Sequence, residues 1–213
     1  MKAMVFRGGK IVLAEVPRPK IQEPTDAIVR VTSTAICGSD LHILRGEYSV
    51  DEGTIIGHEF LGVVEEVGDH VTDFKPGERV LVYPGFRCGV CEPCRKGMAL
   101  GCLKGGIFGN PTPHGSMHGG QAEYVRVPLA HKTLHLIPDG MSDEDVMLVT
   151  DMLPTGYFAA ENGDIKPGDS VAVFGCGPVG LCAQISAHLF GPSKVFAVDL
   201  ADYRLKVAEQ FRV

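Results

Sequence analysis

Apolar and polar residues alternate along DAIVRVTSTAI, residues 26–36, and this period of two predicts a half-buried β-strand. A second β-branched run follows a glycine-introduced turn at His58 and Glu59, and it predicts another strand. The N-terminal part of the chain is therefore expected to be rich in β-structure.

The C-terminal part has a different pattern. Residues 170–174 form an apolar, β-branched run, and a helical pattern extends from the glycines that follow to His188. Gly191 closes this helix, and KVFAVD at 194–199 forms a second strand. The order strand, helix, strand predicts a βαβ unit.

Composition narrows the class of protein. The 213 residues are 45% hydrophobic and 22% charged, as in globular proteins, and the formal net charge is −6. Without a basic patch for phosphate backbones, we expect a small-molecule partner and no nucleic acid. Neither a signal peptide's apolar core nor a run of about 18 apolar residues occurs, so we expect a cytoplasmic protein that does not interact with membranes.

Four cysteines are clustered in CGVCEPCRKGMALGC, residues 88–102, with the spacing C-x2-C-x2-C-x7-C: Cys88, Cys91, Cys94 and Cys102. In a reducing compartment such a cluster indicates metal binding, and four thiolates without an open position are typical of structural zinc. An iron–sulfur cluster and a reactive or disulfide-forming loop are the alternatives. Cys176 and Cys182 lie in an apolar stretch and are expected to be buried.

A second metal site is expected from two separate segments. TAICGSDLHI at 34–43 contains Cys37, and IIGHEF at 55–60 contains His58. One thiolate and one imidazole are two of the three protein ligands of a catalytic zinc, whose fourth position is left for water or substrate. A third ligand is needed.

These motifs resemble those of the zinc-dependent medium-chain dehydrogenase/reductase family, the alcohol dehydrogenases. The resemblance rests on C-G-S-D-x-H, then G-H-E-x-x-G-x5-G-x2-V, then the four-cysteine lobe. It implies a catalytic zinc on Cys37 and His58. The segment TDMLPTGYFAAE at 150–161 is similar to the branch of bacterial secondary-alcohol and formaldehyde dehydrogenases in which an aspartate, here Asp151, is the third ligand. Glu59 is the competing candidate.

The resemblance also implies roles for neighbouring residues. Ser39 contacts the alcohol oxygen and passes its proton through the nicotinamide ribose to His42 at the surface. Asp40 orients the zinc-bound imidazole by fixing its tautomer, or is an Asx turn or cap. Gly38 and Thr155 contact the cofactor.

The glycine-rich segment predicts the cofactor itself. Gly175, Gly177 and Gly180 complete G-x-G-x-x-G between a strand and a helix, where the helix N-terminus binds pyrophosphate. Asp199 ends the next strand and accepts hydrogen bonds from ribose hydroxyls, so NAD is preferred over NADP. The other candidate cofactor contacts are Pro178, Val179 and Arg204.

The predicted fold class is α/β plus β-rich, in two domains. Residues 1–152 are expected to form a GroES-like catalytic barrel with the structural zinc lobe at 88–102, and residues 153–213 the incomplete N-terminal part of a Rossmann domain. We interpret the chain as a C-terminally truncated fragment of an enzyme that oxidises alcohols or reduces aldehydes and ketones, homo-oligomeric (dimer or tetramer) at full length. The alternative is a non-catalytic, zinc-stapled GroES-like binding module. The segment 106–125 is expected to include a loop that lines the substrate pocket, and its glycines and histidines fit a mobile turn equally well.

Overall fold

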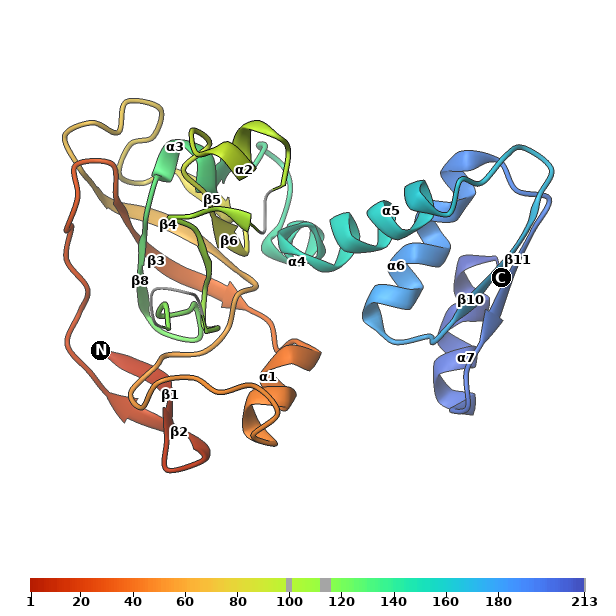
Figure 1. Cartoon of the computed structure of the whole chain (residues 1–213), viewed down its shortest axis with the longest axis horizontal. Coiled ribbons are helices and arrows are strands. Elements are labelled where there is room, and N and C mark those ends of the chain that lie inside the picture. The colour runs from red at the N-terminus through yellow and green to blue at the C-terminus, as the bar shows by residue number, and fades with distance from the viewer. Residues whose placement is uncertain (99–100, 112–115, 213) are drawn as a thin grey trace. The chain divides into compact units, whose positions relative to one another are not determined.

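The computed structural model describes residues 1–98, 101–111 and 116–212 (Figure 1). Positions 99–100 of the predicted cysteine lobe, positions 112–115 of the predicted pocket loop and position 213 lie outside the described residues. The chain divides into two compact units, Met1–Thr150 and Asp151–Val213. Within the described part of the chain, none of the helices has the length and apolar character needed to cross a membrane.

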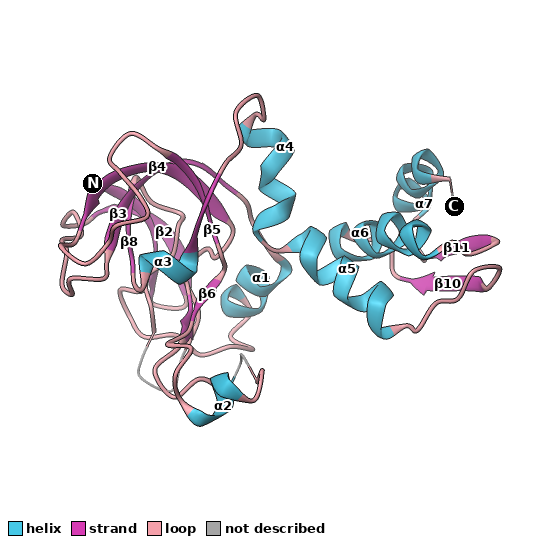
Figure 2. Cartoon of the chain, turned by 90° about the horizontal axis from the view of Figure 1, so that it is seen from above, coloured by secondary structure: helices cyan, strands magenta, loops and turns pink. Residues whose placement is uncertain are grey.

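The first unit contains a five-stranded antiparallel sheet, which curves in the view of Figure 2. In the order across the sheet, its strands are β8 (Tyr124–Val127), β3 (Ala27–Thr34), β4 (Phe60–Val67), β5 (Arg79–Val82) and β9 (Leu134–Leu136). The strands expected from the two apolar runs are confirmed as β3 and β4, which pair with each other. Thr34 at the end of β3 lies opposite Phe60 at the start of β4.

The same unit also contains two short two-stranded antiparallel sheets. They are β1 (Lys2–Arg7) with β2 (Lys10–Glu15), and β6 (Gly85–Phe86) with β7 (Gly106–Ile107). The first hairpin turns through Gly8 and Gly9, both in the left-handed region that glycine tolerates best. Isolated bridges join β1 to the rest of the unit at Ala122 and Ile55.

The core of the first unit lies against the sheet. Phe60 and Phe108 are both fully buried, and their rings meet edge to face with centroids 5.2 Å apart, a favourable aromatic geometry. The cluster around them consists of Ala27, Val29, Val64, Val71, Phe74, Val80, Val82, Val125, Val127, Ala130 and Leu134.

Short helices connect the strands of this unit: α1 (Gly38–Leu44), α2 (Glu92–Arg95), α3 (Ala130–Thr133), α4 (Asp143–Met147) and the 3-10 helix η2 (Leu148–Thr150). Asp143 ties α4 to the sheet. Its Oδ2 accepts a hydrogen bond from the Thr32 hydroxyl and its Oδ1 one from the Arg79 guanidinium, both at 2.6 Å. These bonds, the Thr32 hydroxyl first, lower the pKa of Asp143.

The second unit consists of α5 (Met152–Asn162), β10 (Ser170–Phe174), α6 (Pro178–Ala187), η3 (His188–Phe190), β11 (Lys194–Val198), α7 (Asp202–Ala208) and η4 (Glu209–Phe211). Strands β10 and β11 pair in parallel, with α6 as the crossover (Figure 1), so the predicted βαβ unit is confirmed. Helix α5 packs on α6 at Gly156, where a Cβ would come within 2.6 Å of the Ala183 nitrogen. Cys176 and Cys182 are buried, as expected.

Candidate functional site

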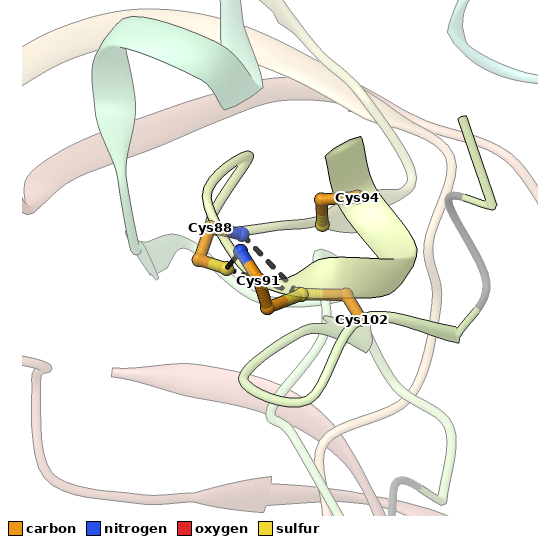
Figure 3. A group of neighbouring side chains, drawn as sticks. All are labelled: Cys88, Cys91, Cys94 and Cys102. Carbon is orange, nitrogen blue, oxygen red and sulfur yellow. Dashed lines mark hydrogen bonds between the residues drawn. The ribbon is translucent and has the colours of Figure 1, made fainter. Parts of the chain in front are cut away.

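The four cysteines of the lobe turn toward one another (Figure 3). The Cys102 sulfur lies 3.7 Å from that of Cys88 and 3.9 Å from that of Cys91. A disulfide needs about 2.05 Å, whereas sulfurs bound at about 2.3 Å to one tetrahedral zinc lie about 3.8 Å apart. The spacing therefore matches four ligands of a single ion, and all seven cysteines are free thiols.

Backbone amides prepare this lobe for anionic sulfur. Cys91 N donates to Cys88 Sγ at 3.4 Å, and Cys88 N donates to Cys102 Sγ at 3.3 Å. Amide donors, from Val90 first and then Cys91, lower the pKa of Cys88 to about 6, while desolvation and neighbouring sulfurs raise that of Cys94 to about 12. The two directions are opposite because ionisation of one thiol disfavours ionisation of a neighbouring one.

A second group of ligand atoms contains Cys37, His58, Glu59 and Asp151, each with one ligand atom within 4.8 Å of the others. Cys37 is the N-cap of α1, and His58 and Glu59 precede β4, so the pairing of β3 with β4 fixes both segments. Asp151 is the N-cap of α5 and is joined by its peptide bond to Thr150, the last residue of the first unit. Both candidates for the third ligand belong to this group.

The donor set of this group fits a cation. His58 is 6% exposed and Glu59 is fully buried, so the group gathers a thiol and two carboxyls around a buried imidazole. Hydrogen bonding to His58 lowers the pKa of Cys37 despite partial burial, with further help from the backbone and hydroxyl of Ser39. Several anionic groups this close are stabilised by a positive charge between them, and thiolate, imidazole and carboxylate are the ligands that zinc prefers.

The three residues expected to act beside the metal all lie on α1. Asp40 is 2% exposed, and its Oδ2 accepts the Cys37 N–H at 2.9 Å. Burial raises the pKa of Asp40, and the nearby charge of His58 opposes that rise. His42 is more exposed: its Nδ1 pairs with the Glu47 carboxylate and its ring lies 5.2 Å from that of Tyr48.

Two residues close to these were not singled out from the sequence. The Asn110 amide nitrogen lies 3.3 Å from His58 Nδ1, and Gln121 Nε2 donates to Asp40 Oδ2 at 3.1 Å. Both come from the segment 106–125, which was expected to line the substrate pocket or to form a mobile turn, without any indication of which side chains would face the site.

The glycine loop of the second unit has the backbone that its motif requires. Gly175 has a φ of +96°, and a Cβ on Gly180 would lie 1.8 Å from the Gly175 carbonyl oxygen. Gly177 is the N-cap of α6 and Pro178 is at its first position, so the helix begins at the loop.

Asp199 closes this loop from β11. Its Oδ2 accepts the Cys176 N–H at 2.7 Å and its Oδ1 accepts the Ala201 N–H at 2.8 Å, and these bonds lower its pKa. Arg204 Nη1 lies 3.7 Å from Asp199 Oδ2. Thr155, on α5, donates its hydroxyl to Asp151 Oδ1 at 3.0 Å.

Comparison with known proteins identifies the family. Residues 23–139 match the model of the alcohol dehydrogenase GroES-like domain. The chain belongs to the zinc-dependent alcohol dehydrogenase family. Two similar relatives are an uncharacterized zinc-type alcohol dehydrogenase-like protein, AdhB, of Bacillus subtilis (strain 168), at 43% identity, and the medium chain reductase/dehydrogenase ucsI of Acremonium sp, at 44%. The chain is 99% covered in both comparisons and spans 58% and 73% of those relatives.

Solved structures agree with this assignment. The alcohol dehydrogenase TADH from Thermus sp. ATN1 is 40% identical, with a TM-score of 0.93 over 99% of this chain and 61% of that one. Further matches include an NAD-dependent alcohol dehydrogenase and a putative zinc-binding dehydrogenase from Sinorhizobium meliloti bound to NADP. The predicted fold class, a GroES-like domain followed by part of a Rossmann domain, is confirmed.

Proposed function

We propose that this chain carries the metal site and the cofactor loop of a zinc-dependent oxidoreductase that transfers a hydride between an alcohol and NAD, with an aldehyde or ketone as the oxidised product. The observation that supports this most strongly is the convergence of Cys37, His58 and two carboxylates within 4.8 Å. This is the donor set of a catalytic zinc, which needs three protein ligands and one position for substrate.

Zinc bound there supplies Lewis acidity toward an alcohol oxygen, and bound NAD supplies the hydride acceptor. The chain's own residues handle the proton. The Ser39 hydroxyl, two positions after Cys37, would accept the alcohol proton as it releases its own, and His42 would take up the released proton at the surface. The His42 ring is partly exposed, which suits exchange of a proton with solvent.

Asp151 is the proposed third ligand, with Glu59 as the alternative. The Thr155 hydroxyl donates to Asp151 Oδ1 at 3.0 Å, which holds the carboxylate in one orientation, and Asp151 offers a ligand atom within 4.8 Å of those of Cys37 and His58. Asp151→Asn and Glu59→Gln separate the two: the variant that loses the ion, measured as zinc per chain, identifies the ligand. Glu59→Gln is expected to retain it.

The cysteine lobe is proposed to hold a separate structural zinc. Four sulfurs within 4.8 Å of one another would fill the four positions of a tetrahedral zinc ion and leave none for substrate. Lys132 supports it by donating from Nζ to the Cys88 carbonyl oxygen at 2.8 Å, which places a cation against the backbone of the lobe.

NAD is the proposed cofactor of the glycine loop. Each carboxylate oxygen of Asp199 accepts one hydrogen bond from a main-chain amide. A carboxylate oxygen can accept a second hydrogen bond, so two ribose hydroxyls can also be bound. A 2′-phosphate would meet this carboxylate and be repelled, so NADP is disfavoured. Pro178, Val179 and Gly180 at the start of α6 are the proposed contacts on the pyrophosphate side.

Metal stoichiometry tests the proposal against the non-catalytic module. The proposed enzyme binds two zinc ions per chain, and Cys37→Ser and Cys94→Ser each reduce this to one. A wild-type protein with one zinc, retained in Cys37→Ser, supports the module instead. In the whole protein, alcohol-dependent NADH formation should disappear with Cys37→Ser, and persistence of that activity would contradict the assigned site.

A further inference from the structure

The side-chain amide of Gln121 lies beside the candidate catalytic metal site. Its Nε2 donates to Asp40 Oδ2 at 3.1 Å and reaches the Ala35 carbonyl oxygen at 3.4 Å. Asp40 is almost fully buried, whereas Gln121 is partly buried. A residue distant in sequence thus contributes a donor to the carboxylate expected to orient His58.

The backbone around Gln121 is fixed to the chain that leads into His58. Three consecutive amides donate to three consecutive carbonyl oxygens: Gly119 to Ile55 at 2.7 Å, Gln121 to Ile56 at 3.0 Å and Gly120 to Gly57 at 2.7 Å. The position of Gln121 is therefore coupled to that of His58 through the main chain.

Glycines make this close approach sterically allowed. A Cβ on Gly57 would lie 2.5 Å from Gln121 Cγ, and Gly57 has a φ of +93°. A Cβ on Gly119 would lie 2.2 Å from the Gly57 carbonyl oxygen. The glycine of the G-H-E motif thus accommodates the Gln121 side chain as well as the turn.

The two oxygens of Asp40 have different surroundings. Oδ2 receives two donors, the Cys37 backbone N–H and the Gln121 amide. Oδ1 is buried and receives no hydrogen bond from the residues that the structure describes. Two donors on one oxygen fix the plane of the carboxylate and reserve the other oxygen as an acceptor.

We propose that Gln121 is a positioning residue for the catalytic metal: by holding Asp40 Oδ2, it keeps Oδ1 available to the ring N–H of a metal-bound His58. This rests on the proposed function, because it assumes that His58 binds the ion. Metal-bound histidines need an acceptor for their second ring nitrogen, and loss of such an acceptor lowers metal affinity about 10–100-fold. Since Gln121 acts through Asp40, we expect a loss of about tenfold.

The experiment measures metal affinity in the whole chain loaded with Co²⁺, which reports both sites through thiolate-to-cobalt absorption. Removal by a chelator is followed for wild type, Gln121→Leu and Gln121→Glu. Glutamate has the size of glutamine but places a carboxylate against Asp40. The Gln121→Glu variant therefore tests the same contact if the leucine variant does not fold. Both variants should lower the Co²⁺ affinity of the Cys37 and His58 site about tenfold, and the loss in Gln121→Glu should be at least as large as that in Gln121→Leu. The Co²⁺ affinity of the four-cysteine site should not change.

A double-mutant cycle distinguishes positioning from general destabilisation. In an Asp40→Ala background, which lacks the acceptor, Gln121→Leu should have no further effect on the affinity of the first site. Gln22→Leu, on the surface of the same unit, is the matched control and should leave both affinities unchanged. The inference would be overturned, with the proposed function left intact, if both Gln121 variants bound two ions with unchanged affinity. It would also be overturned if Gln121→Leu lowered the affinity equally with and without the Asp40 carboxylate. A single ion bound by wild type would overturn the proposed function with it.

Discussion

Replacing Cys102 by serine tests the cysteine lobe most directly. The Cys102 side chain is buried, its sulfur lies 3.7 Å and 3.9 Å from two other cysteine sulfurs, and it accepts the Cys88 N–H. A hydroxyl in its place is a poorer ligand that ionises only at high pH, so one of four thiolates is lost. We expect zinc to leave the lobe and its fold to weaken.

The magnitude follows from the energy of such sites. Structural zinc contributes about 10–16 kcal/mol in four-ligand sites, or about 2.5–4 kcal/mol for each ligand if they contribute equally. At about 1.4 kcal/mol for each factor of ten, Cys102→Ser should lower zinc affinity about 10²- to 10³-fold.

Competition with a chromophoric chelator gives the affinity, and metal analysis gives the number of ions retained. Cys176→Ser is the matched control because Cys176 is equally buried but lies in the second unit, so it should keep both ions. If Cys102→Ser kept wild-type zinc content and affinity, the assignment of four sulfurs to one ion would be wrong.

Three further predictions concern stability and the cofactor. Phe60→Ala removes a fully buried ring and should lower the free energy of unfolding by about 3–5 kcal/mol, measured in urea; a change below about 1 kcal/mol would contradict its place in the core. Gly180→Ala brings a Cβ to 1.8 Å from the Gly175 carbonyl oxygen, so NAD affinity by calorimetry should fall more than about tenfold with helical circular dichroism retained, and unchanged affinity would refute the loop assignment. Because hydrogen bonds lower the pKa of Asp143 in the folded state, its stabilising effect should be complete above the ordinary aspartate pKa and should be lost as the pH falls from there through the lowered pKa of the folded state. The gap in unfolding free energy between wild type and Asp143→Asn should therefore close in acid, and a constant gap would rule this out.

Much of the local structure could be predicted from the sequence. The alternation of apolar and polar residues predicted β3, and the glycine motif between two apolar runs predicted β10, α6 and β11. These signals are local, because the period of two and the backbone freedom of glycine depend on neighbouring residues only. Ligand types and spacing also indicated the groups that the fold brings together, the four lobe cysteines and the set that contains Cys37 and His58.

The surroundings of the metal ligands could not be predicted in the same way. Asn110 and Gln121 come close to His58 and Asp40 only because the loop at 106–125 pairs with the backbone at 55–57. An asparagine or glutamine in a glycine-rich loop gives no periodic signal, and its partner depends on long-range packing. The glycines that allow the two backbone segments to approach could be identified in the sequence, but the side chains that pack against these glycines could not.

The pairing of Thr34 with Phe60 has a consequence for how the catalytic centre tolerates change. Cys37 follows Thr34 closely, and His58 closely precedes Phe60. The hydrogen-bonded pairing of β3 with β4 therefore sets the distance between Cys37 and His58. Within the intervening chain, residues 45–49 lie outside both helix α1, which carries Ser39, Asp40 and His42, and the backbone at 55–57 that pairs with the 106–125 loop. Insertions or deletions in that stretch should reshape what enters the centre while leaving its two anchoring side chains in register, whereas a one-residue slip of the ladder would separate them.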